Sequence, residues 1–285
     1  MNSLRNRVIA IVTLTSLITV VAITITAYQS LGQDQRELIV QQENLETERL
    51  TEKVSQNIRQ RVTALAVARP LLIRDGHLRS PEELKSLIEE QAYLQRAFPG
   101  GVLVFDAQDT AIAESTYVTG RIGTNYADRE HFKRLHSTGE PVISEPIMGR
   151  TTELPLLSFL VPIHHEGQMI GSIGGIIKLG DESILPPQAE YDDTPGSTLS
   201  LIIDKQHQLF IESPGSKPGD KLQSLPPAGE NSLVDAILEK GNQTRMIDYR
   251  GQEYLLATDS VDRLNWVFAR ASPYDQAMAP LVASF

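Results

Sequence analysis

The sequence predicts an α+β fold in which an N-terminal transmembrane helix and a long stalk helix precede two small antiparallel-sheet modules. Three observations predict it. Residues 8–28 carry no charge, residues 29–72 are rich in helix-forming residues, and short apolar runs separated by turn signals follow from residue 102. The runs form two groups, because a connection rich in Pro, Asp and Gly divides them at residues 181–197.

Composition narrows the classes of function. The 285 residues are 41% hydrophobic and 22% charged, which is typical of a globular protein. The absence of cysteine excludes thiol catalysis, thiolate metal sites and disulfides. A formal net charge of -10 would repel nucleic acid, so no nucleic-acid partner is expected. An anionic ligand would therefore need a locally positive site.

The first predicted element is the uncharged run VIAIVTLTSLITVVAITITAY, residues 8–28. About 20 apolar residues are needed to cross the bilayer as a helix, and this run has that length. Arg5 and Arg7 precede it, which favours a cytoplasmic segment 1–7 and an extracytoplasmic, periplasmic location for residues 29–285. A single or first span in the inner membrane, in contact with lipid, is expected. A cleaved signal peptide is the alternative, and it exports the rest of the chain equally.

The predicted stalk helix, residues 29–72, consists mostly of good helix formers. Its apolar positions form an interrupted stripe near helical spacing: Leu38, Leu45, Val54, Ile58 and Leu65. This stripe indicates a partner helix alongside part of the stalk, and hence a homodimer. A helix that lies on its own domain is the alternative.

The first sheet module is predicted over residues 73–180. A helix begins at Pro81, which follows Ser80 in the favoured first position, and the sequence Pro-Gly-Gly ends it at 99–101. A hairpin, a short helix and three further strands follow, over residues 102–107, 110–115, 126–138, 141–147, 154–163 and 168–179. Their mostly hairpin order indicates an antiparallel sheet with helices on one face.

The second module, residues 198–275, repeats this order in miniature. Its expected elements are strands at 198–204 and 208–213, a helix at 230–241, and strands at 243–249, 252–260 and 264–272. Both modules read strand, strand, helix, strand, strand, strand, without a repeat at the level of residues. Residues 276–285 form an exit segment too short to span a bilayer. They are expected to lead toward a missing second span and an output domain; a tethered binding protein is the alternative.

An unusual cluster of charge lies in the first module. The stretch YADREHFKRLH, residues 126–136, puts two arginines, one lysine and two histidines into eleven residues of an acidic protein. A guanidinium presents paired donors that fit a carboxylate and stays charged at every relevant pH. The cluster therefore predicts a recognition site for a small anion.

The whole arrangement resembles the double Cache family of extracellular sensor domains over residues 35–275. The resemblance is carried by the anchor, the long first helix, the two successive sheets, YADREHF at 126–132 and SFLVPIHHEGQMIGSIGGIIKL at 158–179. It implies two PAS-like modules, of which the membrane-distal one holds a ligand and the proximal one relays a conformational change. Such domains occur on chemoreceptors, histidine kinases and cyclic-di-GMP enzymes such as diguanylate cyclases.

The resemblance also implies particular site residues. Residues 129–132, Arg-Glu-His-Phe, resemble the family's R-x-Y-F or R-x-W-Y pattern. Arg129 is then expected to hold a ligand carboxylate, with His131 and Phe132 in the two aromatic places. On a regular helix His131 points roughly 200° away from Arg129. If both touch the ligand, Arg129 must precede the first regular turn.

One departure from the family pattern bears on the ligand. Amino-acid-binding members place an aspartate after the paired glycines of the last strand, where it holds the ligand's ammonium group. Here Ile176 follows the glycines at 174–175. A hydrocarbon side chain cannot balance a positive charge, so an organic acid without an amino group is expected.

A ligand with several carboxylates would need further donors. Arg96, at the end of the helix before the first strand, and Arg150, between two strands, are the candidates for a second cation. Ser158 interrupts an apolar run, and Tyr126 carries a phenol donor. We therefore expect a ligand-binding role for Arg96, Arg150, Ser158 and Tyr126 beside Arg129, His131 and Phe132.

No catalytic residue, metal site or cofactor is expected. The histidines lack the spacing of zinc ligands, and no nucleophile motif is present. The predicted function is ligand sensing in the exported part of a transmembrane signalling receptor, which is not itself an enzyme. The alternatives are a ligand-independent dimerisation module and a secreted hydrolase that uses His131 with Asp128 or Glu130.

Overall fold

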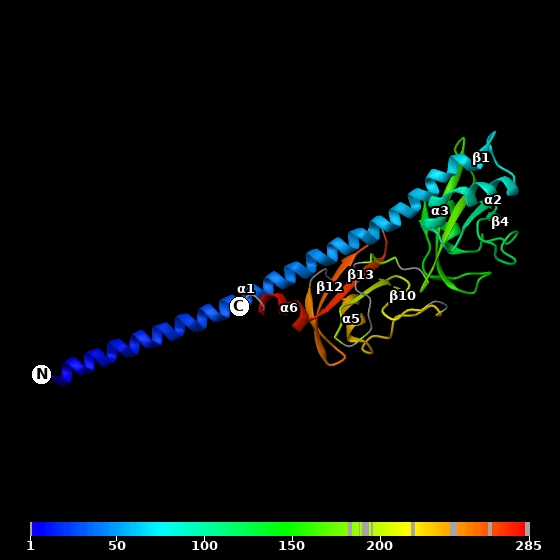
Figure 1. The fold of residues 1–285 in the computed structure, drawn as a ribbon. Helices are drawn as coiled ribbons and strands as arrows, with labels where there is room; N and C mark the ends of the chain where they lie inside the picture. Colours follow the sequence, from blue (N-terminus) through cyan, green and yellow to red (C-terminus); the bar gives the residue numbers. More distant parts are fainter. Residues whose placement is uncertain are drawn as a thin grey trace.

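A computed structural model gives the fold of the chain. It describes residues 2–181, 184–187, 189, 194, 196–217, 220–239, 244–261 and 264–282, with side chains from residue 13 to 23 and from 36 to 279 within these ranges. Figure 1 shows one helix running the length of the molecule, with two sheets stacked along its C-terminal part. The sheet formed by later residues lies nearer the N-terminus of that helix.

The long helix is α1 (Asn2–Ala68), and a 3-10 turn (Arg69–Leu72) continues it. One uninterrupted helix through the predicted stalk is thereby confirmed. The predicted span at residues 8–28 falls within α1, partly on residues whose side chains lie outside the described ranges. Among the residues that the structure describes, no helix is both long and apolar enough to cross a membrane.

The apolar stripe predicted on the stalk is wrong as a single face. Leu38 and Leu45 are exposed, whereas Val54, Ile58 and Leu65 are buried in the chain's own hydrophobic core. The reason is geometric: nine residues separate Leu45 from Val54, which turns the helix by about 900° and leaves the two on opposite sides. One side of α1 lies on its own domain from Glu43 onward, as the alternative reading expected.

A six-stranded antiparallel sheet forms the part of the chain farthest from the N-terminus (Figure 1). Its strands are β3 (Val102–Asp106), β4 (Ala111–Glu114), β5 (Val142–Ile143), β6 (Ile147–Met148), β7 (Pro155–His165) and β8 (Gln168–Lys178). They lie in the order β4-β3-β8-β7-β5, and β6 also pairs with β7. The helices here are α2 (Pro81–Glu90), α3 (Ala92–Ala97) and α4 (Glu130–Thr138).

The second sheet has five antiparallel strands in the order β10-β9-β13-β12-β11. They are β9 (Leu199–Asp204), β10 (Leu209–Glu212), β11 (Arg245–Tyr249), β12 (Gln252–Ser260) and β13 (Trp266–Pro273), with helix α5 (Ser232–Leu238) between β10 and β11. The short strands β5 and β6 both pair with β7; when they are counted as one position, both sheets have their strands in the order second, first, fifth, fourth, third along the chain. The repeat of topology predicted from the sequence is present in this strand order.

Some elements differ from the prediction. The helix predicted at 81–98 is interrupted at Gln91, which separates α2 from α3, and the strand predicted at 141–147 is two short strands. A small hairpin, β1 (Ile73–Arg74) with β2 (His77–Leu78), and a final helix, α6 (Tyr274–Val282), were not predicted. Much of the predicted linker lies outside the described residues. Of its described part, Ile184, Leu185 and Ala189 are buried in the largest hydrophobic cluster.

Apolar side chains cover both faces of each sheet. One face of the distal sheet packs on α1, α2 and α3, and this cluster continues into the second sheet through Ile202 and Phe268. The other face of the distal sheet carries a smaller cluster with Leu103, Phe105 and Phe132, which α4 covers. Because α4 does not seal this face alone, space is left beside it.

The paired glycines of β8 are required by packing. A Cβ built on Gly175 would lie 2.4 Å from Cδ1 and 2.5 Å from Cγ of Phe98, a ring that is fully buried and in edge contact with Phe159. Overpacking of this kind costs about 1–3 kcal/mol. We expect Gly175→Ala to lower the free energy of unfolding by about that much, as measured by urea denaturation.

The matched control for this prediction is the double variant Gly175→Ala/Phe98→Leu. A smaller side chain at position 98 makes room for the new methyl group, so the alanine should cost less in the Phe98→Leu background than in the wild type. Equal costs in the two backgrounds would contradict the packing explanation.

Candidate functional site

A small cavity lies between the α4-covered face of the distal sheet and the segment that enters α4. It has a volume of about 50 Å³. One buried water requires about 10–15 Å³, so the cavity has room for a few waters or one small organic molecule. Six of the seven predicted site residues line it: Tyr126, Arg129, His131, Phe132, Arg150 and Ser158.

The start of α4 brings Arg129 and His131 to the same cavity. The helix begins at Glu130, and Arg129 is its N-cap residue, with extended backbone angles of φ -73° and ψ 137°. Arg129 therefore lies before the first regular turn. Helix geometry requires this position if the side chains of Arg129 and His131 are to face one ligand. On the helix itself His131, Phe132 and Leu135 are buried.

The guanidinium of Arg129 is half-buried at the cavity. Within the described parts of the chain no carboxylate forms an ion pair with it, and no acceptor takes a hydrogen bond from its side chain. An arginine that lines a cavity without a protein partner can offer its full set of donors to an anion.

His131 is the most unusual polar side chain at the site. It is only 3% exposed, and its Nδ1 is a buried atom without a hydrogen-bond partner. Burial, with the charges of Arg129 and Arg134, lowers the pKa of His131 to about 4. The imidazole is therefore neutral at neutral pH, and its buried Nδ1 retains an unused capacity for a hydrogen bond.

Three aromatic rings form one wall of the cavity. Phe105 contacts Phe132 edge-on at a centroid distance of 4.9 Å and Tyr126 at 5.6 Å, and Tyr126 stacks on Phe132 at 6.0 Å. The sheet also contributes Ser158 on β7, which pairs in register with Ile176 on β8. Ile176 thus lies in the cavity, at the position where the family pattern has an aspartate.

Arg150 closes the cavity from the loop after β6, but its donors are already engaged. Nη2 lies 2.5 Å from Oδ2 of Asp128, Nη1 donates to the carbonyl of Asn125 at 2.7 Å, and the guanidinium lies 5.5 Å from the Tyr126 ring centre. The hydrogen bond from Arg150 is the main cause that lowers the pKa of Asp128. Arg150 therefore ties its loop to the segment before α4.

The other charged residues of α4 fix the helix rather than line the cavity. Arg134 donates to the carbonyl of Ile143 at 2.9 Å, and Nε2 of His136 lies 2.8 Å from the carboxylate of Asp109. Burial raises the pKa of Asp109, an effect that His136 opposes. Arg96, the seventh predicted residue, is exposed on α3, a helix that packs on the opposite face of the sheet, so it is not brought to this cavity.

The sequence reasoning missed Arg121. This side chain is 2% exposed and lines the cavity, and its Nη1 lies 3.5 Å from Oε2 of Glu114 and 3.3 Å from the carbonyl of Thr116. Burial lowers its pKa. In the sequence it lies in a glycine-flanked loop, Gly120 to Gly123, where an arginine ordinarily faces solvent. The local pattern therefore held no signal for its burial.

The lining of the cavity is cationic. It includes the three guanidinium groups of Arg121, Arg129 and Arg150, and no Asp or Glu is among the described residues that line it. Four residues of the lining carry hydroxyl groups: Tyr126, Thr151, Thr152 and Ser158. Such a lining can bind a carboxylate by charge-assisted hydrogen bonds, but it offers no anionic partner to an ammonium group.

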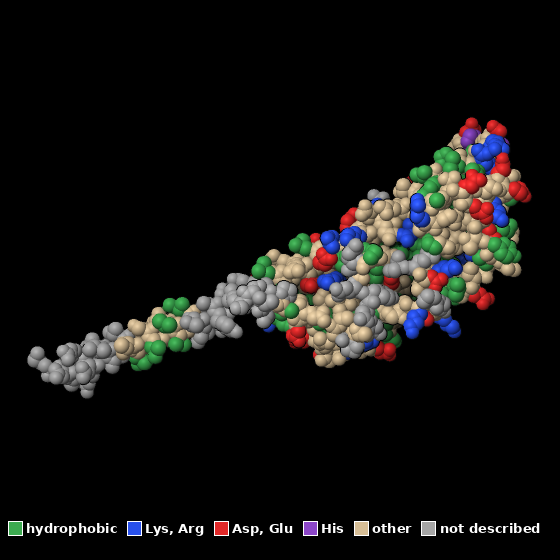
Figure 2. Space-filling model, in the orientation of Figure 1, with side chains coloured by type: hydrophobic (Ala, Val, Ile, Leu, Met, Phe, Trp, Pro, Cys, Tyr) green, Lys and Arg blue, Asp and Glu red, His purple; other side chains and the backbone are tan. Residues whose placement is uncertain are grey.

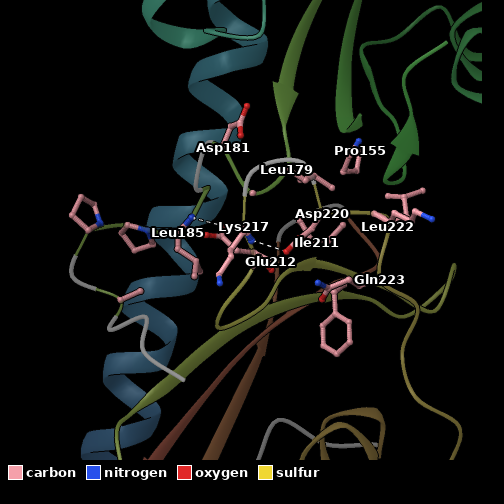
Figure 3. Close-up of a pocket in the computed structure, with 17 residues that line it drawn as sticks. Pro155, Leu179, Asp181, Leu185, Ile211, Glu212, Lys217, Asp220, Leu222 and Gln223 are labelled. Atoms are coloured by element: carbon pink, nitrogen blue, oxygen red, sulfur yellow. Dashed lines mark hydrogen bonds between the residues drawn. The ribbon is translucent and has the colours of Figure 1, made fainter. Parts of the chain in front are cut away.

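A larger cavity, of about 480 Å³, lies between the end of β8 and the second sheet (Figure 3). Its charged lining mixes Asp181, Glu212 and Asp220 with two lysines. The carboxylate of Glu212 already accepts hydrogen bonds from the backbone of Ile184, at 3.0 Å, and of Leu185, at 3.3 Å. Because its charges largely cancel, we place the candidate anion site in the smaller cavity despite the difference in volume.

No family model matches the sequence, and no curated protein matches it. The structure is similar to the ligand-binding domain of the Pseudomonas aeruginosa PAO1 amino acid chemoreceptor PctB in complex with L-Arg, with a TM-score of 0.65 and 18% identity over 85% of this chain and 98% of that one. It is also similar to the ligand-binding domain of the Pseudomonas fluorescens chemoreceptor CtaA in complex with L-isoleucine, with a TM-score of 0.62 and 14% identity over 87% of this chain and 98% of that one.

A third similar structure is the ligand-binding domain of the Pseudomonas aeruginosa PAO1 chemoreceptor PctC in complex with GABA, with a TM-score of 0.61 and 16% identity over 81% of this chain and 98% of that one. These neighbours are double Cache sensor domains, and the likeness supports the expected α+β fold with antiparallel sheets and a long helix. At these identities the likeness establishes the fold.

Proposed function

We propose that this chain is the ligand-sensing region of a signalling receptor and that it binds a small organic acid without an amino group in the distal cavity. The observation that carries the proposal is the guanidinium of Arg129, half-buried at the cavity with no acceptor among the described residues. Beside it the unpartnered Nδ1 of His131 supplies a second polar contact.

The choice of acid over amino acid rests on the lining. The neighbours were solved with L-Arg, L-isoleucine and GABA, and each of these ligands carries an ammonium group as well as a carboxylate. Burying an ammonium group without an anionic or strongly accepting partner is costly. This cavity has Ile176 on β8 and no carboxylate in its described lining, so a ligand that is only anionic fits it better.

The proposal is tested by a thermal-shift screen of the full chain, purified in detergent, against organic acids, amino acids and amines. Stabilisation by one or more acids that lack an amino group is expected, because a ligand that binds only the folded state raises the melting temperature. Stabilisation by amino acids alone would refute the ligand class. Turnover of a compound would favour a hydrolase, and no shift with any compound would favour a ligand-independent module.

We also propose that residues 8–28 anchor the chain in the inner membrane, with the sheets in the periplasm. Support comes from the uncharged sequence and from the described residues 13–23 of α1, which expose apolar side chains on more than one side of a bare helix (Figure 2). The large ones are Leu14, Leu17, Ile18, Val20, Val21 and Ile23. Release of the chain from membranes by alkaline carbonate would contradict this anchor.

The proposed division is into a distal module, residues 73–180, and a proximal module, residues 198–275. The signal would pass from the distal module through the second sheet, which belongs to the proximal module. Glu43 of α1 forms an ion pair with Arg270 and accepts a hydrogen bond of 2.9 Å from Ser272, both on β13. A ligand that favours one position of α1 against β13 would shift the populations of the two arrangements. The relay would be contradicted if the rates of amide hydrogen exchange at this contact were the same with and without the ligand.

A homodimer is proposed from the outer face of α1. Leu38 and Leu45 are 57% and 66% exposed there, seven residues apart, which is the spacing of a coiled-coil seam. A monomer mass in light scattering of the detergent-solubilised chain would exclude this arrangement at the concentration used.

A further inference from the structure

Arg121 has a buried charge that the protein only partly satisfies. The guanidinium is 2% exposed, yet its contacts are long: 3.5 Å from Nη1 to Glu114 and 3.3 Å from Nη1 to the carbonyl of Thr116. Hydrogen bonds from nitrogen to oxygen ordinarily measure 2.7–3.2 Å. Nε and Nη2 have no acceptor among the described residues. A buried cation left in this condition is costly unless a further anion completes its shell.

Glu114 backs Arg121 rather than competing for the cavity. It lies on β4, is buried itself, and does not belong to the described lining; its other oxygen accepts a hydrogen bond of 3.2 Å from the backbone of Val118. A carboxylate behind a guanidinium fixes the orientation of the group and leaves the donors on its far side for a ligand. Arg121 and Arg129 are thus two cavity-lining cations with donors to spare, since Arg150 is engaged by Asp128.

We propose that the cavity binds a dicarboxylate, with one carboxylate held by Arg129 and His131 and the second held by Arg121. This inference rests on the proposed function and deepens it by naming the class of acid. The aromatic wall and Ile176 would cover the short hydrocarbon chain between the two carboxylates. The volume of about 50 Å³ restricts that chain to a few carbons.

The first test uses the wild-type full chain in detergent and needs no variant. Isothermal titration at pH 7 and constant ionic strength compares dicarboxylates with monocarboxylates of equal chain length: malonate with propanoate, succinate with butanoate, and glutarate with pentanoate. In at least one pair we expect the dicarboxylate to bind about ten- to hundredfold more tightly, the effect of one further charge-assisted contact.

Two outcomes separate the two proposals. If acids bind but no dicarboxylate exceeds its monocarboxylate partner, the inference about Arg121 is overturned and the proposed function stands. If no organic acid binds, here or in the wider thermal-shift screen, the proposed function fails, and the inference fails with it.

The second test assigns the preference to Arg121. Arg121→Gln should remove the advantage of the dicarboxylate while the monocarboxylate retains its affinity, because Arg129 still holds it. Lys133→Gln is the matched control: it removes one positive charge from an exposed position of α4 outside the cavity, so the preference should persist. A preference unchanged in Arg121→Gln, in a variant whose melting temperature shows that it is folded, would overturn the assignment.

Discussion

Replacing Arg129 with glutamine is expected to weaken binding of the ligand acid at least about 30-fold, because truncating one member of a buried, hydrogen-bonded charge pair costs about 2–5 kcal/mol. Glutamine keeps most of the length of the side chain but removes the charge and the paired donors that fit a carboxylate. Arg129 has no ion pair within the described structure, so its loss should leave folding nearly unchanged. The measurement is isothermal titration with the best acid of the screen.

Lys133→Gln provides the matched control for this prediction. Lys133 is another cation of the same helix, but it is exposed, contacts Glu130 at 3.5 Å and does not line the cavity. The substitution Lys133→Gln removes the same unit of positive charge as Arg129→Gln, so any general effect of net charge on anion binding should appear in both variants. Equal affinities in Arg129→Gln and Lys133→Gln would show that Arg129 does not contact the ligand.

Most of the fold could be predicted because the signals that specify it are local. The strand β12 (Gln252–Ser260) agrees with its predicted range, since a short apolar run bounded by turn residues marks a buried strand. The turn between β7 and β8 is similarly marked by Glu166 and Gly167, which both adopt positive φ. The predicted stripe on α1 was wrong because it joined residues of two opposite helix faces. Leu38 and Leu45 are on the exposed face, and Val54, Ile58 and Leu65 are on the buried one.

The part of the candidate site that is continuous in sequence was the easiest to predict, although the distant residues Arg150 and Ser158, chosen by residue type, also line the cavity. Four residues of one short segment line the cavity: Tyr126, Arg129, His131 and Phe132. The family pattern at residues 129–132 identified this segment. Arg121 could not be found in this way, because its burial depends on how a glycine-flanked loop folds over β4. Arg96 does not line this cavity for the converse reason: a basic residue at a helix end does not indicate which face of the sheet that helix covers.

His131 offers the second large effect, on stability as a function of pH. The pKa of this histidine falls from an ordinary 6.5 to about 4 in the folded protein, chiefly because of burial and also through the charges of Arg129 and Arg134. The folded state therefore binds fewer protons than the unfolded state between these two values. It follows that this contribution to stability is fully present above pH 6.5 and is lost as the pH falls toward 4.

The expected size follows from the shift. One pKa unit corresponds to about 1.4 kcal/mol, so His131 alone should reduce the free energy of unfolding by roughly 2 kcal/mol between pH 7 and pH 5. His131→Phe replaces the imidazole with an apolar ring and removes no hydrogen bond from Nδ1, which has no partner. The difference between the unfolding free energies at pH 7 and pH 5 should therefore shrink by about this amount in the variant.

Urea denaturation of the ligand-free chain at the two pH values measures this difference. His77→Gln, which changes an exposed histidine at β2 outside the cavity, is the matched control and should retain the wild-type difference. If His131→Phe also retained it, the imidazole would be charged or solvated in the folded protein. The site for a carboxylate would then have to rest on the arginines alone.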